Sequence, residues 1–223
     1  MGGNLLQEDR RKIYEAVGHV ITAMPMEQAA QSLKTFSIEI LAKIHVATRS
    51  VAPTKQELQD VSGEFSCFQQ ALRAERLPSD GLENLEAMLS IVQGFGNELP
   101  TSCQNSCEEA WAVFDPFLAR FGDRYDFAER ANRVLRFGLR LFGDSARPVV
   151  PSALARMSLS FEATGISSYL WIAGKLVSSF GEDDVGAVRT GLRDLYERAT
   201  AKVISLLQAK SPRDIPDGMF ASD

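Results

Sequence analysis

The sequence predicts an all-α chain. Apolar residues recur at spacings of three and four in one segment after another, which is the period of a helix that buries one face. No convincing stretch alternates Val, Ile, Thr or aromatic residues with polar ones, so strand signals are nearly absent. Proline, glycine and aspartate divide the 223 residues into segments of helical length.

The first two helices are expected at residues 7–23 and 26–48, separated by Met24 and Pro25. Two helices joined by so short a turn form an antiparallel hairpin. The second helix carries an apolar stripe at helical spacing, made of Leu33, Phe36, Ile40, Ile44 and Ala47.

A third helix is expected at 55–76, where apolar residues keep the same spacing, and a fourth at 82–95. The next helix, 103–121, contains Pro116. Because an interior proline removes a backbone donor, we expect a kink or a break after Asp115.

Four more helices complete the chain. The first runs from Tyr125 to Phe142 and is ended by Gly143. The others run from Pro151 to just before Gly165, over 166–180 and over 184–209. Pro151 suits the first turn of its helix, where its missing donor costs nothing.

The segment FAERANRVLRFGLRLFG, residues 127–143, is the most informative part of the chain. Its apolar residues share one broad arc, and its arginines crowd into about a third of the circumference. The arginines in question are Arg130, Arg133, Arg136 and Arg140. We expect a helix that lies on a core and presents guanidinium groups outward as a candidate partner-binding patch for carboxylates or phosphates. An ordinary solvated helix face is the alternative.

Helix pairs of about 40 residues are typical of two-helix solenoids of the HEAT or armadillo kind. We therefore expect one α-solenoid segment over 1–223, with about five repeats and a possible insertion helix at 54–80. Each hairpin of such a stack buries its apolar faces against its neighbours, so we expect no single central pocket. A compact helical bundle is the alternative architecture.

The composition restricts the function. Apolar residues make up 45% and charged residues 24%, and no run of about 18 uncharged apolar residues occurs, so we expect neither secretion nor a membrane partner. A net charge of −5 argues against direct binding of nucleic acid.

No catalytic motif is recognisable in the chain, so we expect no enzyme and no cofactor. The cysteines Cys67, Cys103 and Cys107 are odd in number, which makes a disulfide framework improbable. Cys103 and Cys107 lie four residues apart, but a zinc site needs three or four ligands. We expect ordinary buried thiols and no metal.

Four segments resemble, in order, parts of the importin-β superfamily, closest to its transportin-SR branch. They are YEAVGHVITAMP at 14–25, CQNSCEEAWAVF at 103–114, RVLRFGLRLFG at 133–143 and SSYLWIAGKLVSSFG at 167–181. The likeness implies central to C-terminal repeats of a much longer superhelix. The segment 54–76 has no counterpart in it.

The resemblance implies a nuclear transport receptor that shuttles between nucleus and cytoplasm through the nuclear pore. Its implied partners in the full-length receptor are protein cargo with Arg-Ser-rich domains, Ran-GTP and nucleoporins. The main Ran-binding surface of the family lies in N-terminal repeats, which this chain does not resemble. Two other functions stay open: a generic HEAT scaffold for protein binding, and a compact helical enzyme or ligand carrier with a buried pocket.

Overall fold

The computed structural model describes residues 6–49, 79–92, 100, 103, 105–182 and 186–208, and every regular element in those ranges is helical. The helices are α1 (Gln7–Thr22), α2 (Met26–Arg49), α4 (Ser106–Phe121), α5 (Tyr125–Phe142), the 3₁₀ turn η2 (Gly143–Val149), α6 (Val150–Thr164), α7 (Ser168–Phe180) and α8 (Gly186–Leu207). A further helix spans 79–91. None of these helices combines the length and the hydropathy needed to cross a bilayer.

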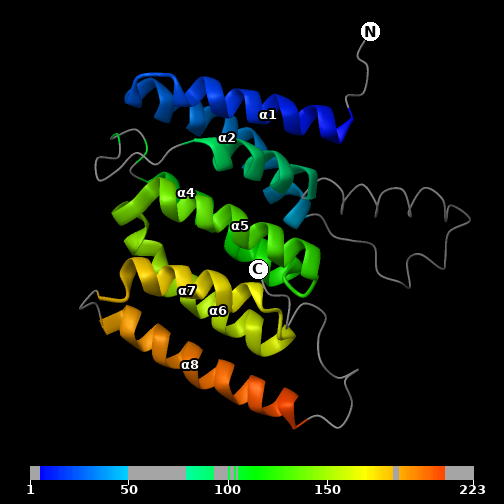
Figure 1. The fold of residues 1–223 in the computed structure, drawn as a ribbon, viewed down its shortest axis with the longest axis vertical. Helices are drawn as coiled ribbons and strands as arrows, with labels where there is room; N and C mark the ends of the chain where they lie inside the picture. The colour runs from blue at the N-terminus through cyan, green and yellow to red at the C-terminus, as the bar shows by residue number, and fades with distance from the viewer. Residues whose placement is uncertain are drawn as a thin grey trace, which may run out of the picture.

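The helices form a stack that runs from α1 at one end to α8 at the other (Figure 1). One layer consists of α2, α4, α6 and α8, each of which packs against the next. The other layer consists of α1, the 79–91 helix, α5 and α7. In this layer Gln7 of α1 donates hydrogen bonds to the side chains of Glu83 and Asn84, and α5 packs against α7.

The predicted all-α solenoid is therefore confirmed. The chain alternates between the two layers, so equivalent helices recur about 40 residues apart, as in two-helix repeats. For example, α5 begins at Tyr125 and α7 at Ser168. The number of repeats and the insertion at 54–80 stay predictions, because most of that segment and residues 209–223 lie outside the described residues.

The predicted helix ends agree with the structure to within a few residues. The helix predicted from Tyr125 to Phe142 has those bounds. Gly143 and Gly165, which follow α5 and α6, have φ values of 49° and 74°, a region that glycine adopts without a Cβ clash. The helix predicted at 55–76 lies outside the described residues.

The predicted break at Pro116 does not occur, because α4 runs without interruption from Ser106 to Phe121. A kink at this position stays a prediction. Pro116 itself is exposed. Phe114 before it and Phe117 after it are both buried. Burial of these rings on each side of the proline keeps both halves of α4 helical, and this packing outweighs the lost backbone hydrogen bond.

A cluster of aromatic rings joins α4 to α5. Phe117 and Phe127 meet edge to face with ring centroids 5.8 Å apart, and Phe121 lies 5.3 and 5.6 Å from these two rings. Such geometries add to the free energy of area burial. Trp111 and Trp171 pack partly buried against the core.

Candidate functional site

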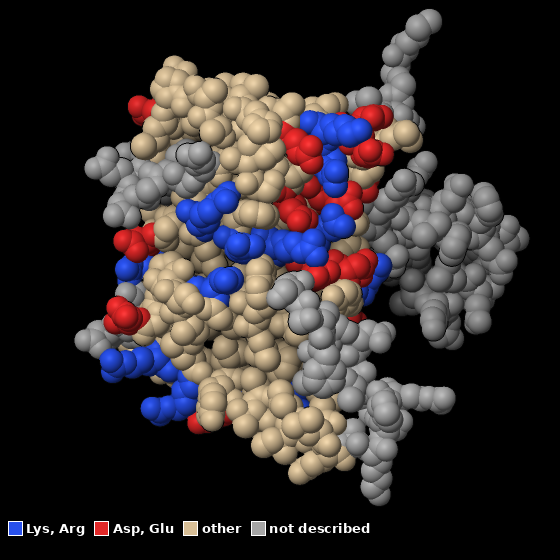
Figure 2. All heavy atoms as spheres, viewed as in Figure 1, with Lys and Arg blue, Asp and Glu red and all other residues tan. Residues whose placement is uncertain are grey.

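The arginines of α5 lie on the face shown in Figure 2, where basic side chains gather across the middle of the stack beside carboxylates. The structure brings all four predicted residues to one side of one helix, as the sequence predicts. Their surroundings differ, however, and those differences decide which of them can meet a partner.

Arg130 and Arg133 link α5 to the 79–91 helix. Arg130 Nη1 lies 2.8 Å from Glu83 Oε1 and 3.9 Å from Glu86 Oε2. Arg133 lies 2.8 Å from Glu129 and 3.7 Å from Glu86. The side chain of Arg133 is 46% exposed and that of Arg130 is 33% exposed. Both guanidinium charges are therefore offset by carboxylates within the chain.

Arg140 caps the C-terminal end of the 79–91 helix. Its Nη2 donates hydrogen bonds to the carbonyl oxygens of Leu89 and Val92, each at 2.8 Å. These carbonyls belong to the last turn, where intrahelical donors run out and where a cation also meets the negative end of the helix dipole. Arg140 therefore acts mainly as a cap for a neighbouring helix.

Arg136 is exposed and sits between α5 and α7. Its guanidinium carbon lies 5.6 Å from the ring centroid of Trp171 on α7. Lys175 Nζ lies 6.0 Å from the same ring. Two cations thus flank one indole, an arrangement that holds the guanidinium in place while leaving its donors toward solvent. Reasoning from sequence did not identify Trp171 or Lys175 as neighbours of the arginine row.

Arginines also join successive helices of the other layer. Arg120 of α4 donates to the carbonyl oxygen of Thr48 in the last turn of α2. Arg156 of α6 pairs with Asp115 of α4 at 2.6 Å. Arg198 of α8 pairs with Glu162 of α6. Each step from α2 to α8 therefore includes a charged contact between neighbours, at sites that stay partly exposed.

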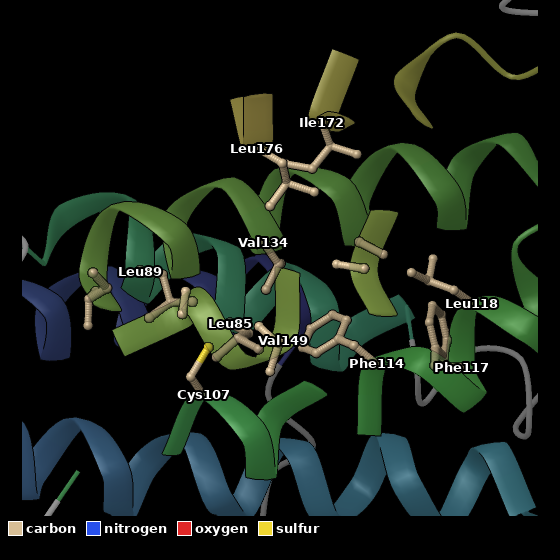
Figure 3. Close-up of a cluster of buried hydrophobic side chains, with 14 of the residues drawn as sticks. Leu85, Leu89, Cys107, Phe114, Phe117, Leu118, Val134, Val149, Ile172 and Leu176 are labelled. Atoms are coloured by element: carbon tan, nitrogen blue, oxygen red, sulfur yellow. The ribbon is translucent and has the colours of Figure 1, made fainter. Parts of the chain in front are cut away.

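An apolar cavity of about 430 Å³ lies within the stack. Its walls come from α2, α4, α5, η2, α6, α7 and the 79–91 helix. Figure 3 shows side chains that line it, with Leu176 and Ile172 of α7 directed toward Val134 of α5 and Cys107 facing them from α4. The expectation that no central pocket forms is therefore wrong.

Small residues explain why the cavity exists. Gly138 lies on the inward arc of α5, and a Cβ built on it would meet no atom within 4 Å. Ala110 and Ala153 line the same space.

The cavity opens to the surface at its α2 and α4 edge. Ile38, which lines it, is 50% exposed. Lys34 and Glu109 also line it and pair across the two helices at 3.6 Å. The opening therefore carries one charge of each sign and no net charge.

Cys103 and Cys107 are buried free thiols, which confirms the predicted role. Burial raises the pKa of the Cys107 thiol to about 12, and the nearby Glu108 carboxylate adds to the shift. Such a thiol is neutral and unreactive at neutral pH. Among the described residues, no group of three or more His, Cys, Asp or Glu side chains is placed to hold a metal ion. Cys67 lies outside them.

Comparisons with known proteins agree with this architecture. Residues 101–207, which contain α4 to α8, match the family described as the Transportin-3/Importin-13 fourth TPR domain. The chain is 21% identical over 207 residues to a Schizosaccharomyces pombe protein named uncharacterized protein C11G11.07, a match that covers 92% of this chain and 20% of that protein.

A second relative is the mRNA transport regulator MTR10 of Saccharomyces cerevisiae, 29% identical over 89 residues, which is 39% of this chain and 9% of MTR10. The chain thus spans a fifth or less of the length of these relatives. Three of the four predicted segments of likeness, 103–114, 133–143 and 167–181, fall within the matched residues 101–207. The stacked helices and these matches support a likeness of residues 101–207 to a domain of the Transportin-3/Importin-13 family.

Proposed function

We propose that this chain is part of a nuclear transport receptor that binds protein cargo and shuttles between nucleus and cytoplasm. The observation that carries the proposal is the match of α4 to α8 to the Transportin-3/Importin-13 domain. The likeness to MTR10, which is named an mRNA transport regulator, supports the same function. The proposed role is noncatalytic and rests on complementary surfaces.

The charged contacts between neighbouring helices suit such a role. The pairs Arg130–Glu83 and Arg156–Asp115 each join two helices by partly exposed side chains. Exposed ion pairs contribute about 0–1 kcal/mol each, so small changes in the angle between helices cost little. A stack of this kind can bind cargo in one curvature and Ran-GTP in another, and the two ligands are then coupled through their differential affinity for the two shapes.

For the cargo site, we propose the patch formed by Arg136 and Lys175 at Trp171. Arg133 extends this patch along α5 when a phosphate replaces Glu129 and Glu86 as its partner. Arg-Ser-rich segments are basic when unmodified, and this patch would repel them. Phosphorylation gives each serine a charge of about −1.5 to −2 and three acceptor oxygens, which arginine side chains bind well. The proposed cargo is therefore a phosphorylated Arg-Ser-rich protein.

Fluorescence anisotropy with a phosphorylated Arg-Ser peptide and its unphosphorylated form tests the cargo site. We expect the phosphorylated peptide to bind at least about ten-fold more tightly, because its phosphates can pair with arginine in place of like-charge repulsion. The double variant Arg133→Glu and Arg136→Glu should remove that preference. The matched control Arg193→Glu reverses an exposed arginine on α8 and should keep it. Equal affinity of both variants for the phosphorylated peptide would refute the site.

The Ran and nucleoporin part of the proposal needs the complete gene product. A pull-down with Ran loaded with a nonhydrolysable GTP analogue should capture it, whereas Ran-GDP should not. Addition of Ran-GTP should also release a bound Arg-Ser peptide, since coupling between two ligands is reciprocal. Cargo binding that is insensitive to Ran-GTP would favour a generic HEAT scaffold instead.

A further inference from the structure

We propose that the apolar cavity between the two layers is a binding site for an uncharged, predominantly hydrophobic small molecule. The inference is independent of the cargo site, because the cavity faces the interior while the α5 arginines face outward. It also goes beyond the proposed transport function.

The size and the chemistry of the cavity indicate a small ligand. Its volume of about 430 Å³ falls within the range of roughly 300–1,000 Å³ that is typical of small-molecule sites. Deep in the cavity the walls are aliphatic or aromatic, including Val134, Phe142, Met157 and Leu176. Such walls offer no partner for a buried charge, whose desolvation would go uncompensated.

The opening also favours an uncharged ligand. Lys34 and Glu109 line it and already pair with each other at 3.6 Å. A carboxylate or an ammonium group on a ligand would therefore meet one attractive and one repulsive charge. A neutral hydrophobic molecule meets no charge repulsion at the opening, and its binding free energy becomes more favourable with each apolar side chain that it covers.

The depth of the cavity favours a small molecule over a peptide helix. The lining extends from Ile38 on α2, at the surface, to Leu176 on α7 in the opposite layer. A helix of about 10 Å diameter lies along a groove and could not follow this course between two packed layers. A slender molecule can, and it would touch α2 and α7 at once.

This placement has a consequence for the stack. A ligand that contacts helices of successive repeats would restrict their relative movement, and a restricted stack binds other partners differently. The cavity is thus suited to a ligand that stiffens the solenoid as well as stabilising it.

Two glycines provide a matched pair of variants for the test. Gly138 and Gly174 both lie inside helices, and a Cβ on either would meet no atom within 4 Å. Gly138 lines the cavity and Gly174 does not, being exposed on α7. Replacement by methionine should improve helix propensity at both positions, but only Gly138→Met fills the cavity.

The experiment is a titration of the chain with 1-decanol, followed by NMR of labelled Ile, Leu and Val methyl groups. We expect saturable shifts at Val134, Ile172 and Leu176, and none at Ile204, which is exposed on α8. Gly138→Met should weaken binding by about ten-fold or more, since it removes the space that the probe occupies, and Gly174→Met should leave it unchanged. Thermal unfolding should show the same contrast, with decanol raising Tm of the wild type and of Gly174→Met only.

Three outcomes would overturn the proposal. They are an absence of saturable shifts, shifts that spread equally over exposed methyl groups, and equal affinity of the two glycine variants. If Gly138→Met lacks a helical circular dichroism spectrum, Val149→Phe narrows the cavity from η2 and takes its place. Retention of full decanol affinity by a folded Val149→Phe would also contradict the site.

Discussion

Arg130 on α5 and Glu83 in the 79–91 helix form an ion pair with 2.8 Å between Nη1 and Oε1. Both side chains are about two-thirds to three-quarters buried, at 33% and 25% exposed. The pair joins helices that are separated in sequence by the whole of α4. It therefore reports on the packing of adjacent repeats and gives the first prediction.

A double-mutant cycle with Arg130→Ala and Glu83→Ala should give a coupling free energy of about 0.5–1 kcal/mol in urea unfolding, and the coupling should fall with added salt. The control is the pair Arg11 and Glu15 within α1, which is more exposed and 3.5 Å apart, where we expect a smaller coupling. A coupling free energy of zero between residues 130 and 83 would mean that this ion pair does not stabilise the packing of adjacent repeats.

Tyr169 and Gly122 make a second contact between repeats. The buried Tyr169 hydroxyl donates to the Gly122 carbonyl oxygen at 2.7 Å. Tyr169→Phe should lower the free energy of unfolding by about 1–2 kcal/mol, because that buried acceptor loses its donor. Gly122→Ala should cost more, about 3 kcal/mol, because its Cβ would come within 2.4 Å of the hydroxyl and 2.3 Å of the Leu118 carbonyl oxygen.

Chemical denaturation checks both changes. Gly174→Ala serves as control and should stabilise the chain by about 0.5–1 kcal/mol, because alanine favours a helix interior more than glycine does. The added methyl group would meet no atom within 4 Å. A harmless Gly122→Ala would show that the close approach of α7 to the end of α4 is not required.

Pro116 interrupts the backbone hydrogen bonds of a helix that nevertheless continues through it. Pro116→Ala should therefore raise the free energy of unfolding, by about 1–3 kcal/mol, because it restores one helical hydrogen bond at an exposed position. Part of the gain is offset by the greater freedom of the unfolded chain. Urea midpoints measure the effect, and Pro25→Ala, just before α2, should bring no gain. A loss of stability in Pro116→Ala would contradict a continuous α4.

The Cys107 thiol should make stability depend on alkaline pH. Its folded pKa is raised from 9.0 to about 12, mainly by burial. Between these values the unfolded chain releases a proton that the folded chain keeps, so the free energy of unfolding falls as pH rises. The contribution of this thiol to the free energy of unfolding is complete below pH 9 and should be smaller by roughly 3 kcal/mol at pH 11.

Unfolding free energies of the wild type and of Cys107→Ser at pH 8 and pH 11 give the comparison. The variant should lose less stability over that interval, because it lacks the titrating thiol. Equal losses would show that Cys107 ionises as easily in the folded chain as in the unfolded one.

The helical periodicity of the sequence predicted most of the described fold. The bounds of α5 were predicted to the residue because Gly143 follows an apolar stripe and ends the helix. Pro116 shows the limit of local rules. The penalty of an interior proline is known from sequence, but the burial of Phe114 and Phe117 that outweighs it depends on helices elsewhere in the chain.

The candidate sites divide in the same way. The spacing of the four arginines placed them on one face of α5, since rotation along a helix is fixed by the backbone. Which of them contact other helices was not predictable, because Glu83, Glu86 and Trp171 approach α5 from elsewhere in the chain. The cavity was missed because the volume left between two layers depends on the fit of side chains from several helices, Gly138 among them.

By itself the sequence determined the helices, their apolar faces and the likeness to transport receptors, because these depend on residues close together along the chain. Tertiary structure alone decided that Arg130 and Arg140 bind neighbouring helices, that Arg136 lies over Trp171 and that an apolar space remains inside the stack. The physical reason is distance along the chain. Backbone periodicity acts over a few residues, whereas charge pairing and packing depend on which helices meet.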